Sequence, residues 1–224
     1  MPIVAGWVAD ATSMECIVRS VKMITVDCEQ GSEMWFQARL GLVTASNFAQ
    51  VLNKGAGRGD YMDILVAERW RGVREEAKYY DKNMKHGNDT EAEARDYYAM
   101  AHSCIVEQVG FVKRDDDIGG SPDGLVGEDG MIEIKCPMGK THVKYKRMFK
   151  TGKMPSCYVP QVQGLLWITE RQWCDFVSYD PLSPTPLLTI RVERDADCIA
   201  NIAAQTALFV KELKEMVKET VGEF

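Results

Sequence analysis

Residues 121–137 read SPDGLVGEDGMIEIKCP, and the expected fold is built outward from this stretch. Its centre is turn-forming, whereas residues 131–135 form an apolar run that is typical of a strand. Side chains two apart on a strand share a face, so Glu133 and Lys135 project together while Ile134 turns into the core. If the turn folds back as a hairpin, Asp123 lies beside them. Two carboxylates and one ammonium group gathered in this way indicate a divalent-metal site that hydrolyses a phosphodiester.

Length and composition set the class of protein. At 224 residues the chain can bury a sizeable core, and we expect one domain over residues 31–224 with residues 1–30 as an arm of unknown role. No apolar run is long enough to span a membrane, and the N-terminus does not resemble a signal peptide, so we expect a cytoplasmic protein. The seven scattered cysteines form no C-x-x-C pair, which argues against zinc and iron–sulfur sites.

The order of the expected elements predicts an α/β fold with a central mixed β-sheet flanked by helices. The pattern indicates strands over 105–113, 173–179 and 187–193 in addition to the hairpin at 121–135. It indicates helices over 32–40, 44–52, 61–70, 161–169 and 195–219, a helix capped at 88–90 and running to about 101, and a basic helix from about 140. Residues 54–60 (KGAGRGD) lack the ending of a nucleotide P-loop and are predicted to be a flexible surface loop.

Because the candidate ligands of the site are all oxygen atoms, we expect the metal to be Mg²⁺. Asp123, Glu133 and the backbone carbonyl of Ile134 are the candidate ligands, and Lys135 would orient or deprotonate the attacking water or neutralise charge on the phosphate. A third acidic ligand from a helix would complete a two-metal site. Glu91 is the favoured candidate and Glu93 the alternative, although Glu91 and Arg95 also have the spacing of an ordinary i,i+4 salt bridge.

A basic run with no acidic residue extends from 140 to 153, which is unusual in a protein of net charge −6. Such a run predicts a surface that follows the phosphates of a nucleic acid beside the active strand. Its candidate DNA contacts are Lys140, His142, Lys144, Lys146 and Arg147. Gln161, at the start of the next helix, is a candidate to hold a water or a phosphate oxygen near the metals.

Several blocks together resemble the lambda-type phage (alkaline) exonuclease family, a branch of the PD-(D/E)xK nucleases with the restriction-endonuclease-like fold. The resemblance covers residue 30 to the C-terminus. It rests on these blocks: W-x-x-x-R-L-G-x-x-T-A-S from Trp35 to Ser46, Glu91, S-P-D-G-L from Ser121, E-x-K-C-P from Glu133, Q-V-Q from Gln161 with Trp167, Y-D-P from Tyr179, and V-E-R-D from Val192.

The resemblance implies a Mg²⁺-dependent, processive 5′→3′ exonuclease that acts on linear double-stranded DNA ends, with two metal ions per site and Mn²⁺ as a substitute. It implies release of 5′-mononucleotides, a 3′ single strand, a homotrimeric ring and a phage-type single-strand annealing protein as partner. It also implies a phage or prophage origin within a bacterial cell. Two other functions stay open: a non-catalytic DNA-end-binding module and a structure-specific endonuclease on the same fold.

Within that resemblance, Arg39, Ser46 and Ser121 match positions that hold the 5′-phosphate, and Gln161 matches a residue beside them. A terminal phosphate held in a pocket measures off one nucleotide, and an arginine fork suits it. The chain departs from the family at Thr141, where the lambda enzyme has a phosphate-binding arginine. Lys140 or His142 would have to replace that contact.

Overall fold

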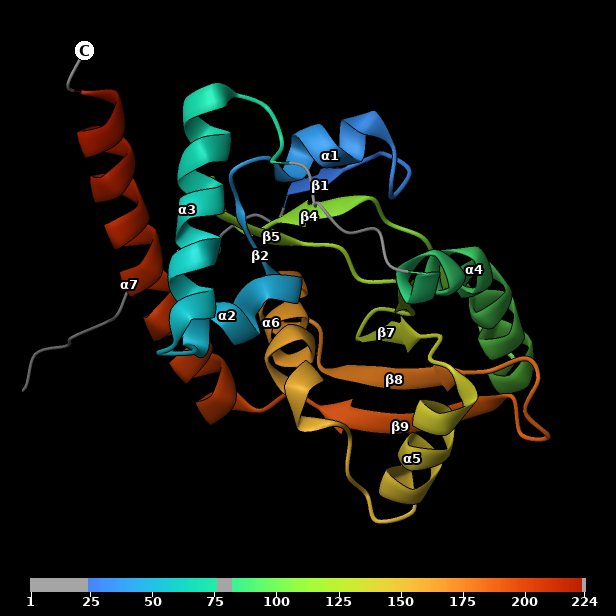
Figure 1. Cartoon of the computed structure of the whole chain (residues 1–224). Helices are drawn as coiled ribbons and strands as arrows, with labels where there is room; N and C mark the ends of the chain where they lie inside the picture. The colour runs from blue at the N-terminus through green and yellow to red at the C-terminus, as the bar shows by residue number, and fades with distance from the viewer. Residues whose placement is uncertain (1–23, 76–81, 223–224) are drawn as a thin grey trace, which may run out of the picture.

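A computed structural model describes residues 24–75 and 82–222 of the chain. The chain mixes helices and strands, and the helices lie around two mixed sheets (Figure 1). The mixed α/β fold expected from the sequence is therefore confirmed, but its strand hydrogen bonds are divided between two sheets instead of one.

The first sheet has the strand order β1-β4-β5-β2. Its strands are β1 (Ile24–Val26), β4 (Phe111–Lys113), β5 (Ile118–Gly120) and β2 (Val43–Thr44). β2 runs parallel to β5, and the other neighbours are antiparallel. A side chain at Gly120 would collide with Leu165 of helix α6, so the missing Cβ lets β5 lie close against that helix.

The second sheet has the order β3-β6-β7-β8-β9 and carries the hairpin. Its strands are β3 (Val106–Glu107), β6 (Gly124–Val126), β7 (Gly130–Lys135), β8 (Trp173–Tyr179) and β9 (Leu187–Glu193). β7 and β8 are parallel, whereas β6 and β7 form the predicted antiparallel hairpin. The predicted bounds of β8 and β9 are confirmed.

Seven α-helices and two short 3₁₀ helices are found within the described ranges. They are α1 (Glu33–Arg39), α2 (Phe48–Leu52), α3 (Ala56–Arg71), α4 (Lys82–His102), α5 (Gly139–Phe149), α6 (Val159–Thr169), α7 (Ala196–Val221), η1 (Ala45–Asn47) and η2 (Ser156–Tyr158). α3 and α7 lie side by side at one end of the molecule, and α4 and α5 lie at the other (Figure 1).

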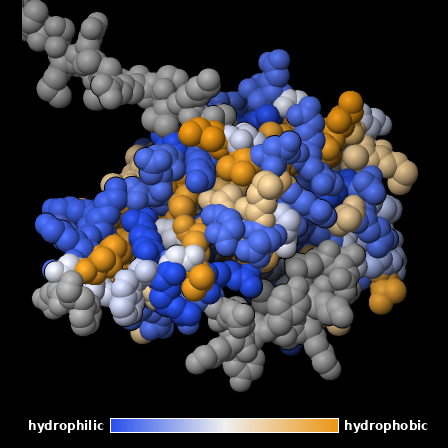
Figure 2. Space-filling view, turned by 90° about the horizontal axis from the view of Figure 1, so that it is seen from above, coloured by the Kyte–Doolittle hydropathy of each residue, from blue (hydrophilic) through white to orange (hydrophobic). Residues whose placement is uncertain are grey.

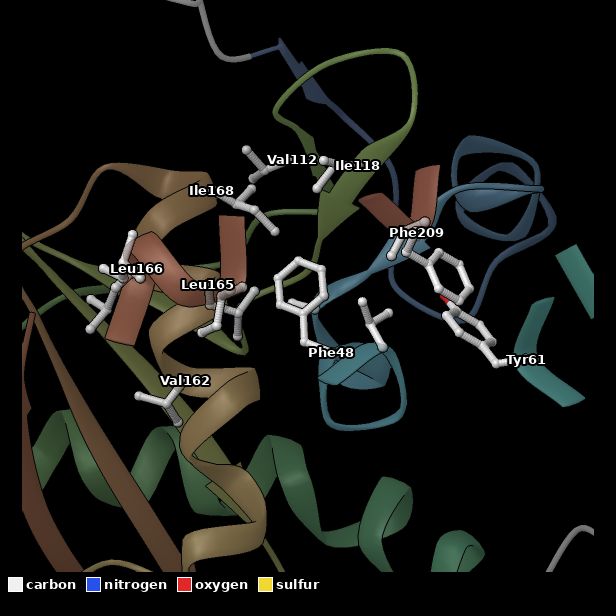
Figure 3. Packing of buried hydrophobic residues seen from close by; sticks show 14 of the residues in the cluster. Phe48, Tyr61, Val112, Ile118, Val162, Leu165, Leu166, Ile168 and Phe209 are labelled. Carbon is white, nitrogen blue, oxygen red and sulfur yellow. The ribbon is translucent and has the colours of Figure 1, made fainter. Parts of the chain in front are cut away.

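The main core surrounds α6, which is buried on nearly every side. Leu165 and Leu166 of this helix share one buried cluster with Phe48 of α2 and with Phe209 of α7, which stacks on Tyr61 of α3 (Figure 3). A second cluster joins α4 to the opposite face of the hairpin sheet, and its buried members are Ala94, Tyr98, Ile132, Ile134, Val177 and Tyr179. Ile134 therefore turns into the core, and Glu133 and Lys135 face the α6 side, as the strand period predicts.

Three predictions about local structure are wrong. Residues 56–60 are the first turns of α3 and not a loop, because Arg58 binds Glu212 and stacks on Phe209 of α7. Residues 88–90 lie inside α4, which begins at Lys82, and so do not cap it. The expected strand over 105–113 is two strands, β3 and β4, that belong to different sheets.

The remaining predicted helices are found with small shifts of their ends. Ser32 caps α1 by accepting a hydrogen bond from the Trp35 amide, and Asp195 caps α7 in the same way through Cys198. Residues 44–52 are divided between β2, η1 and α2.

The surface seen from above is mostly hydrophilic, with hydrophobic residues scattered over it (Figure 2). Within the described residues, every helix is too short or too polar to cross a membrane. The described part of the predicted arm, from residue 24, is paired into the first sheet through β1, and residues 1–23 lie outside the described residues.

Candidate active site

The hairpin brings Asp123 next to strand β7. Gly124 pairs with Ile132, so the antiparallel register places Asp123 opposite Glu133. The Ile134 amide donates a hydrogen bond of 2.6 Å to Asp123 Oδ2. Burial raises the pKa of Asp123, and the positive charge of Lys135 opposes that shift. The backbone thus fixes one oxygen of this carboxyl group and turns the group toward the side chains of β7.

Glu133 lies at the centre of the cluster. It is 1% exposed, and its Oε1 accepts hydrogen bonds from Lys135 Nζ at 2.5 Å and from Gln161 Nε2 at 2.6 Å. Its Oε2 is buried and has no hydrogen-bond partner among the described residues. Burial, followed by the charge of Asp123, raises the pKa of Glu133 to about 8. A buried carboxylate oxygen without a partner is costly unless something binds it.

Lys135 is charged and held in place. Burial lowers the pKa of its ammonium group, but the charges of Glu133 and Asp123 outweigh that effect, and the net shift is upward. Lys135 Nζ also lies 5.3 Å from the ring centre of Tyr158, which belongs to η2. The structure therefore gathers a permanent positive charge and two acidic groups on one side of the sheet.

α4 supplies the third acidic group. Glu91 Oε1 accepts a hydrogen bond of 2.7 Å from Arg95 Nη2. Burial and the charge of Asp123 raise the pKa of Glu91 to about 7, so these two carboxyl groups interact. The alternative residue, Glu93, instead accepts a hydrogen bond of 2.8 Å from the hydroxyl of Tyr179. This contact anchors α4 to β8, whereas Glu91 is the member of this pair whose pKa responds to Asp123.

The donor set is suited to a hard divalent cation. Glu91, Asp123 and Glu133 each use one oxygen in a contact within the protein, and the other oxygen has no hydrogen bond to another described residue. The described acidic, histidine and cysteine side chains nevertheless form no ready-made cluster of three or more around one point. Lys135 and Arg95 hold two of the carboxylates, so their free oxygens would have to turn slightly to share an ion.

Arg39 of α1 belongs to a second cluster, which reaches through Trp35 to Ser121, shortly before β6. Its guanidinium lies 4.2 Å from the ring centre of Trp35 and 3.5 Å from Thr44 Oγ1. Burial lowers the pKa of Arg39, and no described carboxylate forms an ion pair with it. A partly buried arginine without an acidic partner is suited to binding an anion.

The two predicted serines are each linked to Arg39 through one other residue. Ser46 Oγ lies 3.3 Å from Thr44 Oγ1, which Arg39 also contacts. Ser121 Oγ accepts a hydrogen bond of 2.7 Å from the indole nitrogen of Trp35 and donates one of 2.7 Å to the Gly110 carbonyl. Trp35 therefore links α1 to the turn that carries Asp123.

The basic helix α5 divides into two sets of residues. Lys140, Lys144 and Arg147 are exposed, and the last two line a surface hollow of about 420 Å³ with Met148 and Thr151. His142 is buried, and its ring nitrogens lie 2.9 Å from Ser178 Oγ and 3.0 Å from the Thr185 carbonyl.

Lys146 donates a hydrogen bond of 2.7 Å to Thr185 Oγ1, so it joins His142 in holding the loop between β8 and β9. The burial of His142 is incompatible with the predicted phosphate contact, since both of its nitrogens are already used. No local sequence signal indicates this, because basic residues dominate the segment whichever way they face.

Sequence reasoning also missed two residues that support the turn. Gln30 Nε2 donates to the carbonyls of Val109 at 2.8 Å and Pro122 at 3.0 Å, although the sequence predicts that residues 1–30 form a separate arm. Arg95 Nε donates to the Asp123 carbonyl at 2.8 Å, although its spacing from Glu91 indicates only a salt bridge. Neither backbone contact has a signature in the local sequence.

Comparisons with known proteins identify the family and the fold. Residues 34–172 match the family described as YqaJ-like viral recombinase domain. The chain is 40% identical to the crystal structure of an alkaline exonuclease, LHK-Exo, from Laribacter hongkongensis, with a TM-score of 0.78 over 84% of this chain and 96% of that one. The complex of LHK-Exo with dAMP matches equally well.

A more distant match is a phage-related exonuclease from Haemophilus somnus 129PT, at 16% identity and a TM-score of 0.61 over 80% of this chain and 96% of that one. At that identity the likeness shows the shared fold alone. No curated protein matches the chain.

Proposed function

Since this chain belongs to the family of YqaJ-like viral recombinase domains, we propose that it is a deoxyribonuclease that degrades double-stranded DNA from its ends. The observation that carries the proposal is the buried Glu133 beside Asp123 and Lys135, with an Oε2 that no described residue binds. Residues 31–224 would act as one catalytic domain, and the family match at 34–172 includes each of these three residues.

Glu91, Asp123, Glu133 and the Ile134 carbonyl would hold Mg²⁺, in two sites, with Mn²⁺ as a substitute. The cation would supply Lewis-acid stabilisation of the phosphate and a nucleophile at neutral pH. The ammonium of Lys135 would orient the attacking water and neutralise developing charge, while Gln161 holds Glu133 in register through its 2.6 Å hydrogen bond.

Arg39, Ser46 and Ser121 would bind the terminal 5′-phosphate. The support is an Arg39 guanidinium without an ion-pair partner among the described residues, which contacts Trp35 and Thr44. Trp35 binds the Ser121 hydroxyl, and Thr44 Oγ1 lies 3.3 Å from Ser46 Oγ. Lys140, Lys144 and Arg147 would contact the DNA backbone from α5. A phosphate anchored beside the carboxylates would select ends over interior bonds and would favour 5′→3′ removal of mononucleotides.

Further properties rest on the resemblance to the lambda-type exonucleases. They are processive digestion by a homotrimeric ring, a 3′ single-stranded product, and a phage-type annealing protein that receives this strand. A non-catalytic end-binding module is disfavoured because Asp123, Glu133 and Lys135 are all present and converge. An endonuclease on the same fold remains the alternative, and a comparison of linear with closed circular DNA distinguishes the two activities.

The decisive experiment uses a linear duplex labelled separately at each end, with and without a 5′-phosphate. Mg²⁺-dependent loss of the 5′ label, faster on phosphorylated ends and stopped by EDTA, is the expected result. A covalently closed circle is the matched substrate, because an exonuclease spares it and an endonuclease cuts it. Lys135→Ala should abolish digestion in a folded protein. Intact linear ends after incubation with folded wild-type protein and Mg²⁺ would refute the proposal.

A further inference from the structure

Arg95 joins two parts of the candidate active site that come from different elements. Its Nη2 donates to Glu91 on the same helix at 2.7 Å, and its Nε donates to the backbone carbonyl of Asp123 at 2.8 Å. The Arg95 side chain is only 12% exposed, whereas that of Glu91 is 30% exposed. Arg95 is therefore more than one half of a surface salt bridge, since its second donor holds the hairpin.

The geometry of the guanidinium makes this link specific. Nε and a terminal nitrogen lie on one edge of a rigid plane and present two parallel donors at a fixed spacing. The helix carboxylate and the Asp123 backbone are thereby held at a set distance from each other. Gln30 holds the preceding carbonyl, that of Pro122, from the other side of the turn.

We propose that Arg95 is a positioning residue that sets the separation of Glu91 from Asp123 and so determines how tightly the site binds a divalent cation. This inference rests on the proposed function, because it assumes that those two carboxylates share a cation. Residues that orient metal ligands without touching the metal typically contribute about 10- to 100-fold to metal affinity.

Charge and geometry predict opposite effects here, which makes the proposal testable. If Arg95 acted only through its charge, then its removal would leave the carboxylates more negative and would strengthen cation binding. If Arg95 acts by positioning, its removal weakens binding although the site becomes more negative. Arg95→Lys keeps the charge but loses the planar fork, so positioning predicts weaker binding for this variant as well.

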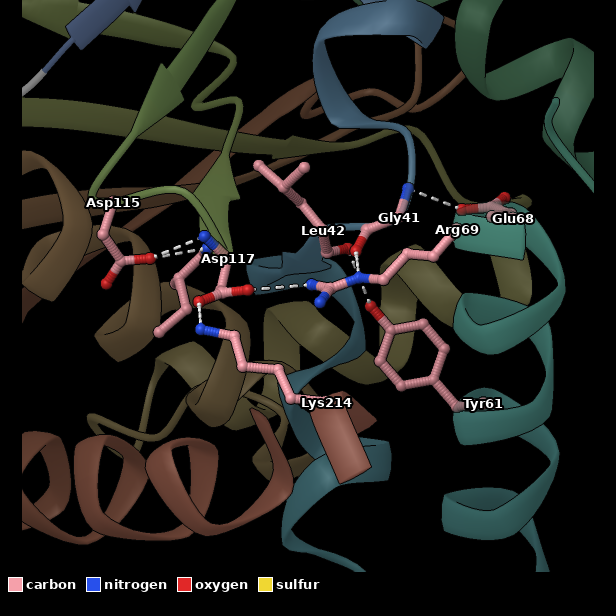
Figure 4. Close-up of polar contacts among 9 residues, drawn as sticks. Gly41, Leu42, Tyr61, Glu68, Arg69, Asp115, Asp117 and Lys214 are labelled. Atoms are coloured by element: carbon pink, nitrogen blue, oxygen red, sulfur yellow. Dashed lines mark hydrogen bonds and ion pairs between the residues drawn. The ribbon is translucent and has the colours of Figure 1, made fainter. Parts of the chain in front are cut away.

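Arg69 provides a matched control (Figure 4). Its Nε donates to the Gly41 carbonyl at 2.7 Å and its Nη2 to Asp117 at 3.0 Å, and its side chain is 19% exposed. It therefore makes the same kinds of contact as Arg95, from a helix and at a similar exposure, away from the carboxylate cluster. Arg69→Gln should lower the melting temperature without changing the Mg²⁺ concentration needed for half-maximal stabilisation.

The experiment titrates Mg²⁺ into the full-length wild-type, Arg95→Gln, Arg95→Lys and Arg69→Gln proteins without DNA and records the melting temperature. A rise of about tenfold or more in the half-saturating Mg²⁺ concentration is expected for both Arg95 variants, relative to the wild type, and not for Arg69→Gln. An unchanged or lower half-saturating Mg²⁺ concentration in Arg95→Lys would overturn the inference. If Arg95→Gln does not fold, the result for Arg95→Lys alone tests the inference.

Digestion of linear duplex by the same proteins separates this inference from the proposed function. Wild-type protein that binds Mg²⁺ but leaves DNA ends intact would contradict the nuclease proposal. The Mg²⁺ titration would still test whether Arg95 affects cation affinity. Wild-type protein that digests ends while Arg95→Lys binds Mg²⁺ normally contradicts the role of Arg95 alone.

Discussion

Arg39 and Glu133 illustrate how single residues carry chemistry in this fold. Each is an ionisable group with reduced exposure to water, and the described residues do not use its full capacity for ion pairs or hydrogen bonds. Removing a charged group from water costs free energy, so such a residue is retained where a ligand compensates for that cost. Arg39 would meet a phosphate, and Glu133 would meet a cation.

Arg39→Gln tests the phosphate role at this scale. A charge-assisted hydrogen bond contributes about 1.5–3 kcal/mol, so KM for a 5′-phosphorylated end should rise by roughly tenfold or more. KM for a 5′-hydroxyl end should change little, because that end has no terminal phosphate to lose. Steady-state digestion of the two substrates measures the ratio, and an undiminished preference for phosphate would contradict the assignment.

The residues that carry the chemistry of the site are easier to predict from the sequence than the residues that hold them in place. Asp123, Glu133 and Lys135 can be found because strand periodicity and a short turn fix their relative directions. Arg95 and Gln30 escape prediction, because each acts through a backbone carbonyl that is distant in sequence. Such contacts depend on the tertiary fold and not on local pattern.

Helix α5 combines two tasks on its two faces. The face with His142 and Lys146 holds the loop between β8 and β9, and the face with Lys144 and Arg147 is open. Variants on the two faces should therefore have separable effects, one on stability and the other on DNA binding.

His142→Ala should destabilise the protein by about 2–3 kcal/mol, because it removes the buried hydrogen bond with Ser178 and the partly buried one with the Thr185 carbonyl. Urea unfolding followed by circular dichroism measures the change. DNA affinity under native conditions should stay close to that of the wild type. A stable variant with weakened DNA binding would instead restore His142 as a DNA contact.

The double variant Lys144→Gln, Arg147→Gln should instead keep its stability and lose DNA affinity. Its melting temperature should be unchanged, since both side chains are exposed and neither forms an ion pair with a described residue. The slope of log affinity for duplex DNA against log salt concentration should fall by about 2, because each of the two residues would neutralise one phosphate. Fluorescence anisotropy at several salt concentrations gives that slope. An unaltered slope would show that Lys144 and Arg147 do not contact DNA phosphates.

Element boundaries are predictable where neighbouring structure has no influence on them. β8 and β9 are apolar runs separated by a proline-rich turn, and their ends follow from those signals. The prediction fails at residues 56–60 because two glycines indicate a loop, whereas contacts of Arg58 with α7 stabilise a helix there. The division of 105–113 between two sheets likewise depends on partners far away in sequence.

At the scale of the whole molecule, a net charge of −6 must be reconciled with a polyanionic substrate. The exposed basic residues of α5 provide a local positive surface in an acidic protein. A ring of copies would concentrate these surfaces around a central channel while the exterior repels DNA.

A homotrimer predicts a solution mass of three times 25.2 kDa. Light scattering coupled to size-exclusion chromatography measures this mass directly. Digestion should also continue on a prebound labelled duplex after a large excess of unlabelled duplex is added, since a closed ring does not release its substrate between steps. A monomeric mass together with immediate competition by the unlabelled duplex would contradict the ring.

Strand β1 and the Gln30 side chain limit how far the chain can be shortened from its N-terminus. Gln30 reaches across to the Pro122 carbonyl, directly before Asp123, and β1 completes one edge of the first sheet. A shortened open reading frame that starts at residue 31 would keep every catalytic side chain and lose a brace behind one of them. A shortened gene should therefore keep at least the segment from Ile24 onward, which retains both β1 and Gln30.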